Sequence, residues 1–244
     1  VEEAFELSDA SAERSAAACT LKLSLPSVIT NVEQNLVLLE ELIAQGYQDR
    51  EALEHRVAAL KKWLAKPSLL SPDQAAEYKA VLDIDLSAIT EPLLACPNDP
   101  DDVRPLSAVA GTPIDEAFIG SCMTHLSHLQ AASHLLRDEP YAASHLWVAP
   151  STRMDRDAIQ QEGGLNVFAQ VGGRVEIPGC SLCMGNQARV RPGATVMSTS
   201  TRNFDNRLGD GTQVFLGSTE LTAITAVLGK LPSVEEYFAF LQRK

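Results

Sequence analysis

Beyond residue 100, short apolar runs alternate with helix-like stretches, and this alternation is what most restricts the fold. The apolar runs lie at 117–120, 145–149, 175–178, 195–198 and 214–217. Helical patterns separate several of them, at 124–136, 154–161 and 218–228. Strands that alternate with helices favour a mostly parallel sheet that is covered on both faces. We therefore predict an α/β fold for this part of the chain.

The first hundred residues have a different pattern, which is typical of helices. Apolar residues recur at three- and four-residue intervals over 26–44, and a second apolar stripe follows Asp49. The alanine-rich stretch 9–18 predicts a helix, and so does a capping box that opens at Ser71. Strict alternation over 82–86 predicts a strand.

A domain boundary is predicted near residue 100. The stretch 96–102 reads CPNDPDD, which is typical of a loop. The predicted fold class is thus α/β, with a mostly helical segment at 1–100 that includes a linker, and a mostly parallel sheet domain at 101–244.

Composition excludes several classes of function. The formal net charge of −12 argues against a nucleic-acid partner, because contacts to phosphates need clustered Lys and Arg. Apolar runs are all too short to span a bilayer, and the first residues do not resemble a signal or transit peptide. The odd number of cysteines suits a reducing compartment, and we interpret the isolated Cys19 and Cys96 as structural.

The remaining three cysteines are candidate ligands. Cys180 and Cys183 lie in a glycine-flanked turn, 179–185, with the sequence GCSLCMG, and Cys122 follows an earlier apolar run. Each cysteine segment follows a predicted strand, and open α/β sheets bind ligands at the carboxyl ends of their strands. Three thiols suit an iron–sulfur cubane with one open iron. A zinc site, which usually has four ligands, and a redox-active C-x-x-C pair remain open alternatives.

Other polar residues have both a functional and a structural interpretation. Arg202 and Arg207 follow a predicted strand and could clamp a carboxylate, or they could be surface arginines. His125 and His128 are three residues apart on a predicted helix, where packing histidines are more common than a metal pair. Glu13 on a helix is most simply a solvated carboxylate.

Three segments together closely resemble the aconitase family. They are IGSC at 119–122, IPGCSLCMG at 177–185 and TSTRNF at 199–204. Further agreement lies at 7–17, 97–102 and 146–155, so the resemblance covers essentially the whole chain. It is tightest to the bacterial type of the enzyme.

The resemblance implies an aconitate hydratase, which isomerises citrate and isocitrate reversibly through cis-aconitate, with 2-methylisocitrate as a further substrate. It implies that Cys122, Cys180 and Cys183 hold a [4Fe–4S] cluster whose fourth iron binds the tricarboxylate substrate as a Lewis acid. Arg202 and Arg207 would bind the substrate carboxylates, and Glu13 would belong to the surrounding hydrogen-bond network. The fold implied is a three-layer aconitase-type domain, preceded at 1–100 by the end of another domain.

The chain also departs from the family. His125 stands where we expect asparagine, and Thr201 stands where many members have asparagine. The family's other domains, one of which carries a serine base, are not found in this sequence. The chain therefore resembles the C-terminal, cluster-binding portion, which would need the remaining domains or a larger assembly for activity.

Two alternatives follow from the same residues. The chain could be a non-catalytic structural or interaction subunit of a larger assembly. It could also be a cluster-state sensor that binds messenger RNA, although its acidic charge gives that little support. A bacterial cytoplasm and a mitochondrial matrix both suit the expected chemistry.

Overall fold

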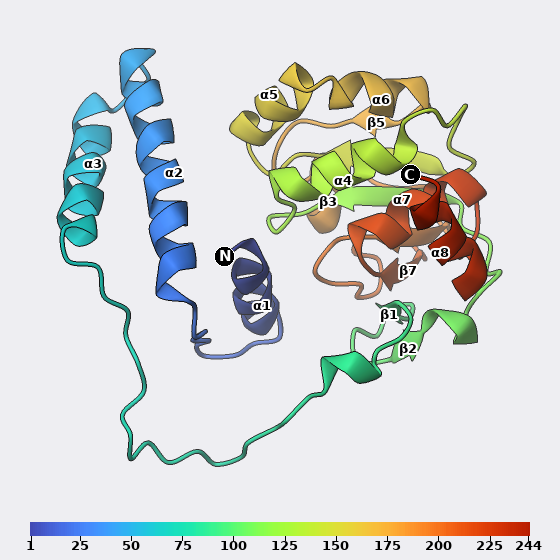
Figure 1. Ribbon diagram of the computed structural model, residues 1–244. Coiled ribbons are helices and arrows are strands. Elements are labelled where there is room, and N and C mark those ends of the chain that lie inside the picture. Colours follow the sequence, from blue (N-terminus) through green and yellow to red (C-terminus); the bar gives the residue numbers. More distant parts are fainter. The chain divides into compact units, whose positions relative to one another are not determined.

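A computed structural model describes residues 1–244, apart from the side chain of Glu2. The chain forms two compact units, Val1–Asp83 and Ile84–Lys244 (Figure 1). The second unit contains the three candidate cysteines and the two candidate arginines. The predicted domain boundary near residue 100 stays a prediction.

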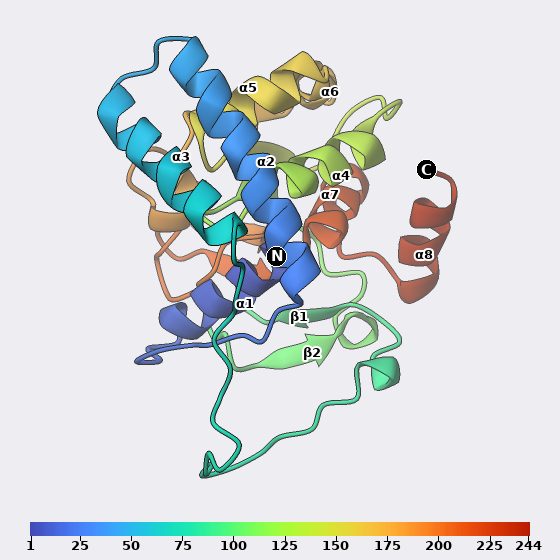
Figure 2. The ribbon, with the colours of Figure 1, turned by 60° about the vertical axis from the view of Figure 1, so that its left-hand side comes forward.

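The first unit is helical. Its helices are α1 (Glu2–Glu13), α2 (Leu25–Ala44) and α3 (Arg50–Leu64). Helices α2 and α3 lie side by side (Figures 1 and 2). Leu36 of α2 and Leu53 of α3 are buried, and Lys61 of α3 forms an ion pair with Glu40 of α2 at 2.7 Å. The two amphipathic helices predicted from apolar spacing are thus confirmed.

Three predictions for the N-terminal part need correction. The alanine-rich stretch is helical only up to Glu13, and no helix follows Ser71. The predicted strand at 82–86 is wrong, since its apolar side chains are exposed and its last residue already belongs to a 3-10 turn, η1 (Leu86–Ala88). A capping box produces a helix, and an alternating pattern a strand, only where the apolar face is also buried against another part of the chain.

The second unit is built on one sheet. Among the described residues it has seven strands in the order β2-β1-β7-β6-β3-β4-β5. Their bounds are β1 (Leu93–Ala95), β2 (Val103–Pro105), β3 (Glu116–Gly120), β4 (His145–Ala149), β5 (Arg174–Val175), β6 (Thr195–Ser198) and β7 (Gln213–Leu216). Strands β3 to β7 pair in parallel, whereas β1 is antiparallel to β2 and β7.

Helices cover one face of this sheet. They are α4 (Leu126–Leu136), α5 (Arg153–Gln161), α6 (Gly164–Gln170), α7 (Thr219–Leu228) and α8 (Val234–Gln242). Alternate strand residues such as Ile119 and Val148 join Leu129 of α4 and Ile224 of α7 in a fully buried core. Figure 1 shows α4 and α7 lying along the sheet on this side.

Loops and a 3-10 turn cover the opposite face. Phe118 and Trp147, which alternate with the helix-facing residues, pack with Leu182 and Leu208 from the loops. The turn η3 (Ser181–Met184), which contains Cys183 and is preceded by Cys180, lies in this layer. The mostly parallel, three-layer α/β fold is therefore confirmed, with an irregular third layer. Every helix in the described residues is too short or too polar to cross a membrane.

Candidate functional site

Three loops that carry candidate residues leave the same edge of the sheet. Strand β3 ends at Gly120, two residues before Cys122, and β6 ends at Ser198 before the arginine loop. The cysteine turn follows β5. Because β3 to β6 are parallel, their carboxyl ends share one edge, which is where such sheets bind ligands.

Hydrogen bonds hold these loops against one another. The Gly120 N–H donates to Oγ1 of Thr199 at 2.8 Å, which ties the first cysteine segment to the arginine loop. The Ser151 hydroxyl donates to the carbonyl oxygen of Ser121 at 2.7 Å. The Gly179 N–H donates to the carbonyl oxygen of Pro150 at 3.0 Å. The loops after β3, β4, β5 and β6 thus form one connected edge.

The cysteine turn packs directly on the arginine loop. Gly185 has a φ of +59°, and a Cβ at this position would lie 2.6 Å from the carbonyl oxygen of Arg207, so only glycine fits. Sγ of Cys183 lies 3.9 Å from Oγ1 of Thr201. Within the turn, the Cys183 N–H donates to the carbonyl oxygen of Cys180 at 2.9 Å.

The thiols differ in exposure. Cys122 is exposed, Cys180 is half-buried and Cys183 is only 2% exposed; all are reduced. Cys96 is buried in the core on the helix-covered face, and burial, with a smaller effect of Asp102, raises the pKa of its thiol. A thiol held protonated is a poor ligand, which supports the structural interpretation of Cys96.

A buried amide anchors the arginine loop. Nδ2 of Asn203 donates to the carbonyl oxygens of Cys96 and Val214 at 2.7 and 3.0 Å. Arg202 and Arg207 on either side are half-buried. Nε of Arg207 is buried and donates no hydrogen bond within the described residues. A buried guanidinium N–H that still needs an acceptor suits an anionic ligand.

Histidines at the start and along α4 make contacts with the backbone and with each other. His125 is the N-cap of α4, and its N–H donates to Nδ1 of His128 at 3.1 Å. Farther along the helix, Nε2 of His134 lies 2.9 Å from the carbonyl oxygen of Lys244. These contacts favour helix capping and packing over a histidine metal pair.

Zinc and a cubane require different arrangements of their ligands. Among the described residues, no three His, Cys, Asp or Glu side chains are placed to hold a metal ion. A zinc ion requires its ligand atoms to converge within about 2.3 Å of one centre. A cubane places each cysteine on a different iron, so its ligand sulfurs lie farther apart. The three cysteines lie on loops that are hydrogen-bonded to one another, and the backbone of Arg207 contacts the cysteine turn, so this donor set is compatible with a cluster held by three cysteines.

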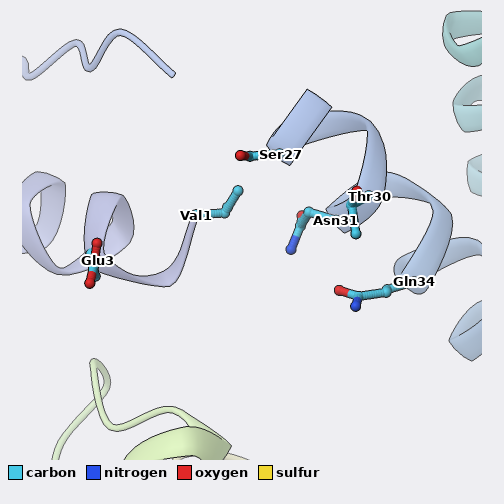
Figure 3. A pocket seen from close by; sticks show the side chains of 6 residues that line it. All are labelled: Val1, Glu3, Ser27, Thr30, Asn31 and Gln34. Carbon is cyan, nitrogen blue, oxygen red and sulfur yellow. The ribbon is translucent and has the colours of Figure 1, made fainter. Parts of the chain in front are cut away.

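The first unit contains a separate cavity, of about 530 Å³. It is lined by Val1, by Glu3 of α1 and by four polar residues of α2 (Figure 3): Ser27, Thr30, Asn31 and Gln34. It contains none of the predicted site residues. Glu13, the predicted catalytic carboxylate, lies at the end of α1, and its role stays a prediction.

Comparison with known proteins decides the family. Residues 107–229 match the sequence model of the aconitase family (aconitate hydratase). This chain belongs to the aconitase family. The matched aconitase segment contains all three candidate cysteines and both candidate arginines, so the resemblance seen in the sequence is confirmed.

Aconitase-family relatives of two kinds are similar to this chain. Aconitate hydratase B of Escherichia coli (strain K12) is 59% identical over 99% of this chain, and that of Helicobacter pylori is 51% identical over all of it. The chain covers 28% and 30% of those proteins. A 3-isopropylmalate dehydratase large subunit of Geobacter sulfurreducens is 32% identical over 89% of this chain and 48% of that protein. These relatives are bacterial, which gives the mitochondrial alternative no support.

Sequence reasoning missed the residues that hold the loops together. Thr199 lies in a motif that resembles the family, but nothing in the sequence predicted its hydrogen bond to Gly120. The same holds for the buried amide of Asn203 and for Ser181, which lies between the two cysteines in the sequence and is fully buried. The one available signal was the density of hydroxyl and amide residues in loops next to apolar strands.

Proposed function

We propose that this chain is the cluster-binding part of an aconitate hydratase that isomerises citrate and isocitrate through cis-aconitate. The chain spans 28% of the length of the aconitate hydratase B relative from E. coli, so the complete reaction would need other segments or a larger assembly. The observation that carries the proposal is the contact between the cysteine turn and the arginine loop through Gly185 and Arg207.

The cofactor in this proposal is a [4Fe–4S] cluster held by Cys122, Cys180 and Cys183. When bound, such a cluster supplies a Lewis-acidic iron that polarises the substrate hydroxyl. The hydroxyl of Thr201 and the closely packed backbone at Gly185 would fix the position of the Cys183 sulfur.

The arginine loop would bind the tricarboxylate substrate. Arg202 and Arg207 are half-buried on the loop that packs on the cysteine turn, and the Nε of Arg207 is open for an acceptor. Guanidinium groups bind carboxylates through paired charge-assisted hydrogen bonds, so two of them orient a polycarboxylate. Glu13 remains a candidate for proton handling on the strength of the resemblance alone.

The sequence identity to each kind of relative favours one substrate over the other. The aconitate hydratase B proteins are 51–59% identical to this chain, whereas the 3-isopropylmalate dehydratase subunit is 32% identical. We therefore place citrate and isocitrate ahead of 3-isopropylmalate. 2-Methylisocitrate is a further substrate to test.

The test is anaerobic reconstitution of the chain with ferrous iron and sulfide, followed by titration with citrate, isocitrate, 2-methylisocitrate and 3-isopropylmalate. A brown chain whose spectrum changes with citrate or isocitrate supports the proposal. Arg207→Gln should weaken citrate binding about 10-fold or more, since a charge-assisted hydrogen bond is lost. The control is Arg156→Gln, because Arg156 is exposed on α5 and lies outside the cysteine and arginine loops.

Activity is measured with and without the missing segments of an aconitate hydratase B relative. Restored hydration of cis-aconitate supports the enzymatic role. A chain that takes up no iron in this experiment supports instead a non-catalytic structural or interaction subunit.

A further inference from the structure

Ser181 combines two unfavourable features inside the cysteine turn. It lies between Cys180 and Cys183, its accessible surface is 0%, and its hydroxyl has no hydrogen-bond partner within the described residues. Its backbone φ is +41°, in the left-handed region. A buried hydroxyl without a partner and a positive φ at a non-glycine residue are each costly.

Glycine at this position would remove both costs. The presence of serine is therefore explained only if the hydroxyl has a partner that the protein alone does not provide. Buried polar atoms of this kind occur where a water, an ion or a redox group supplies the partner. Ser181 directly follows Cys180 and precedes Cys183 by two residues, so this unpartnered hydroxyl belongs to the turn that would hold the cluster.

We propose that the Ser181 hydroxyl donates a hydrogen bond to a sulfur of the cluster held by Cys180 and Cys183. This inference rests on the proposed function. Thr201 provides a parallel in the same site, since its hydroxyl lies 3.9 Å from Sγ of Cys183. Hydrogen bonds to cluster and ligand sulfurs set the reduction potential of an iron–sulfur cluster. A donor stabilises the more negative, reduced state, so Ser181 raises the potential.

Two substitutions separate the hydroxyl from the backbone. Ser181→Ala removes the hydroxyl and keeps the strained Cβ, whereas Ser181→Gly removes both. The matched control is Ser144→Ala, because Ser144 is equally buried before β4 and its hydroxyl donates to the carbonyl oxygen of Ile114 at 2.6 Å. The wild type and the three variants, each spanning residues 1–244, are reconstituted anaerobically with ferrous iron and sulfide.

The readouts are the midpoint potential and the rate at which a chelator removes the iron. Both Ser181 variants should shift the potential downward by the same amount. They should lose iron about two- to tenfold faster, the factor expected for one hydrogen bond. Ser144→Ala should lower the melting temperature and leave the potential unchanged.

Several outcomes would overturn this inference. A wild-type potential in both Ser181 variants means that the hydroxyl's partner is a water. A shift in Ser181→Gly alone means that backbone strain, and not the hydroxyl, sets the potential. If the wild-type chain takes up no iron, the proposed function fails and this inference fails with it, whereas a loaded wild type with unshifted variants refutes the inference alone.

Discussion

Glu116 supports the loop layer through a buried carboxylate, and its replacement gives a quantitative prediction. The side chain of this residue, at the start of β3, is almost fully buried. Its Oε2 accepts a hydrogen bond from Nε1 of Trp147 at 2.7 Å. Its Oε1 accepts from the backbone N–H of Arg191 at 2.8 Å and from the Nε of Arg191 at 3.3 Å. The carboxylate thus joins β3, β4 and the loop that follows the cysteine turn.

Glu116→Gln should destabilise the second unit by about 2–4 kcal/mol. An amide has one acceptor oxygen, so it cannot satisfy Trp147 and the Arg191 backbone together. A buried donor left without a partner costs about 1–3 kcal/mol, and hydrogen bonds to a charged acceptor are worth about 1.5–3 kcal/mol. For a unit of this size the melting temperature should fall by roughly 4–16 °C.

The assay is urea unfolding followed by the fluorescence of Trp147 in a Trp63→Phe background, so that the signal reports on the second unit alone. The matched comparison is Arg191→Ala. This side chain is 69% exposed, and its ion pairs with Asp115 and Glu116 are both 3.3 Å long. Removing it should cost less than Glu116→Gln, because both side-chain contacts are long and the backbone N–H of Arg191 still donates to the carboxylate. Equal costs for the Glu116 and Arg191 variants would refute this account of the buried carboxylate.

Two further predictions concern the cysteine turn and the last helix. Gly185→Ala should lower the free energy of unfolding by more than the roughly 1–2 kcal/mol of left-handed strain, because the new Cβ would meet the Arg207 carbonyl. Gly193→Ala, at a φ of +72° and with open space around it, should cost only the strain. Equal melting temperatures for the two variants would contradict this. Hydrogen bonds from the backbone N–H of Ser233 and the side chain of Lys230 lower the pKa of Glu236. The ionised carboxylate therefore stabilises the fold above the ordinary carboxyl pKa of 4.5, and this stabilisation is lost as the pH falls through the lowered value. Glu236→Gln, which removes the titrating carboxyl, should therefore flatten the acid limb of the stability profile, and an unchanged limb would argue against the cap.

Buried parallel strands were the most predictable part of the fold. Strands β3, β4, β6 and β7 are apolar runs bounded by loop residues, and their periodicity differs clearly from that of α4 and α7. A strand covered on both faces must be apolar throughout, so its sequence alone specifies it.

Short and exposed elements could not be predicted in this way. Strand β2 is exposed along its length, and β1, although apolar, has only three residues, so neither has a recognisable strand pattern. Helix α6 begins at Gly164, where glycine hides the helical signal. Conversely, the alternation at Leu82, Ile84 and Leu86 predicted a strand that has no covering surface.

The candidate site was predictable in its location and not in its internal contacts. Cysteines and arginines that follow parallel strands must gather at one edge of the sheet. The close approach of Gly185 to Arg207 and the open hydroxyl of Ser181 depend on the tertiary packing of loops. Irregular loops have no periodicity from which such contacts could be inferred.

Iron content after anaerobic reconstitution tests the central claim most directly. We expect about four irons per wild-type chain. Single serine substitutions at Cys122, Cys180 and Cys183 should each abolish stable uptake, whereas Cys19→Ser should bind iron as the wild type does. Full iron content in any of the three ligand variants, or an equal loss in Cys19→Ser, would contradict the assignment of the cluster to these three cysteines.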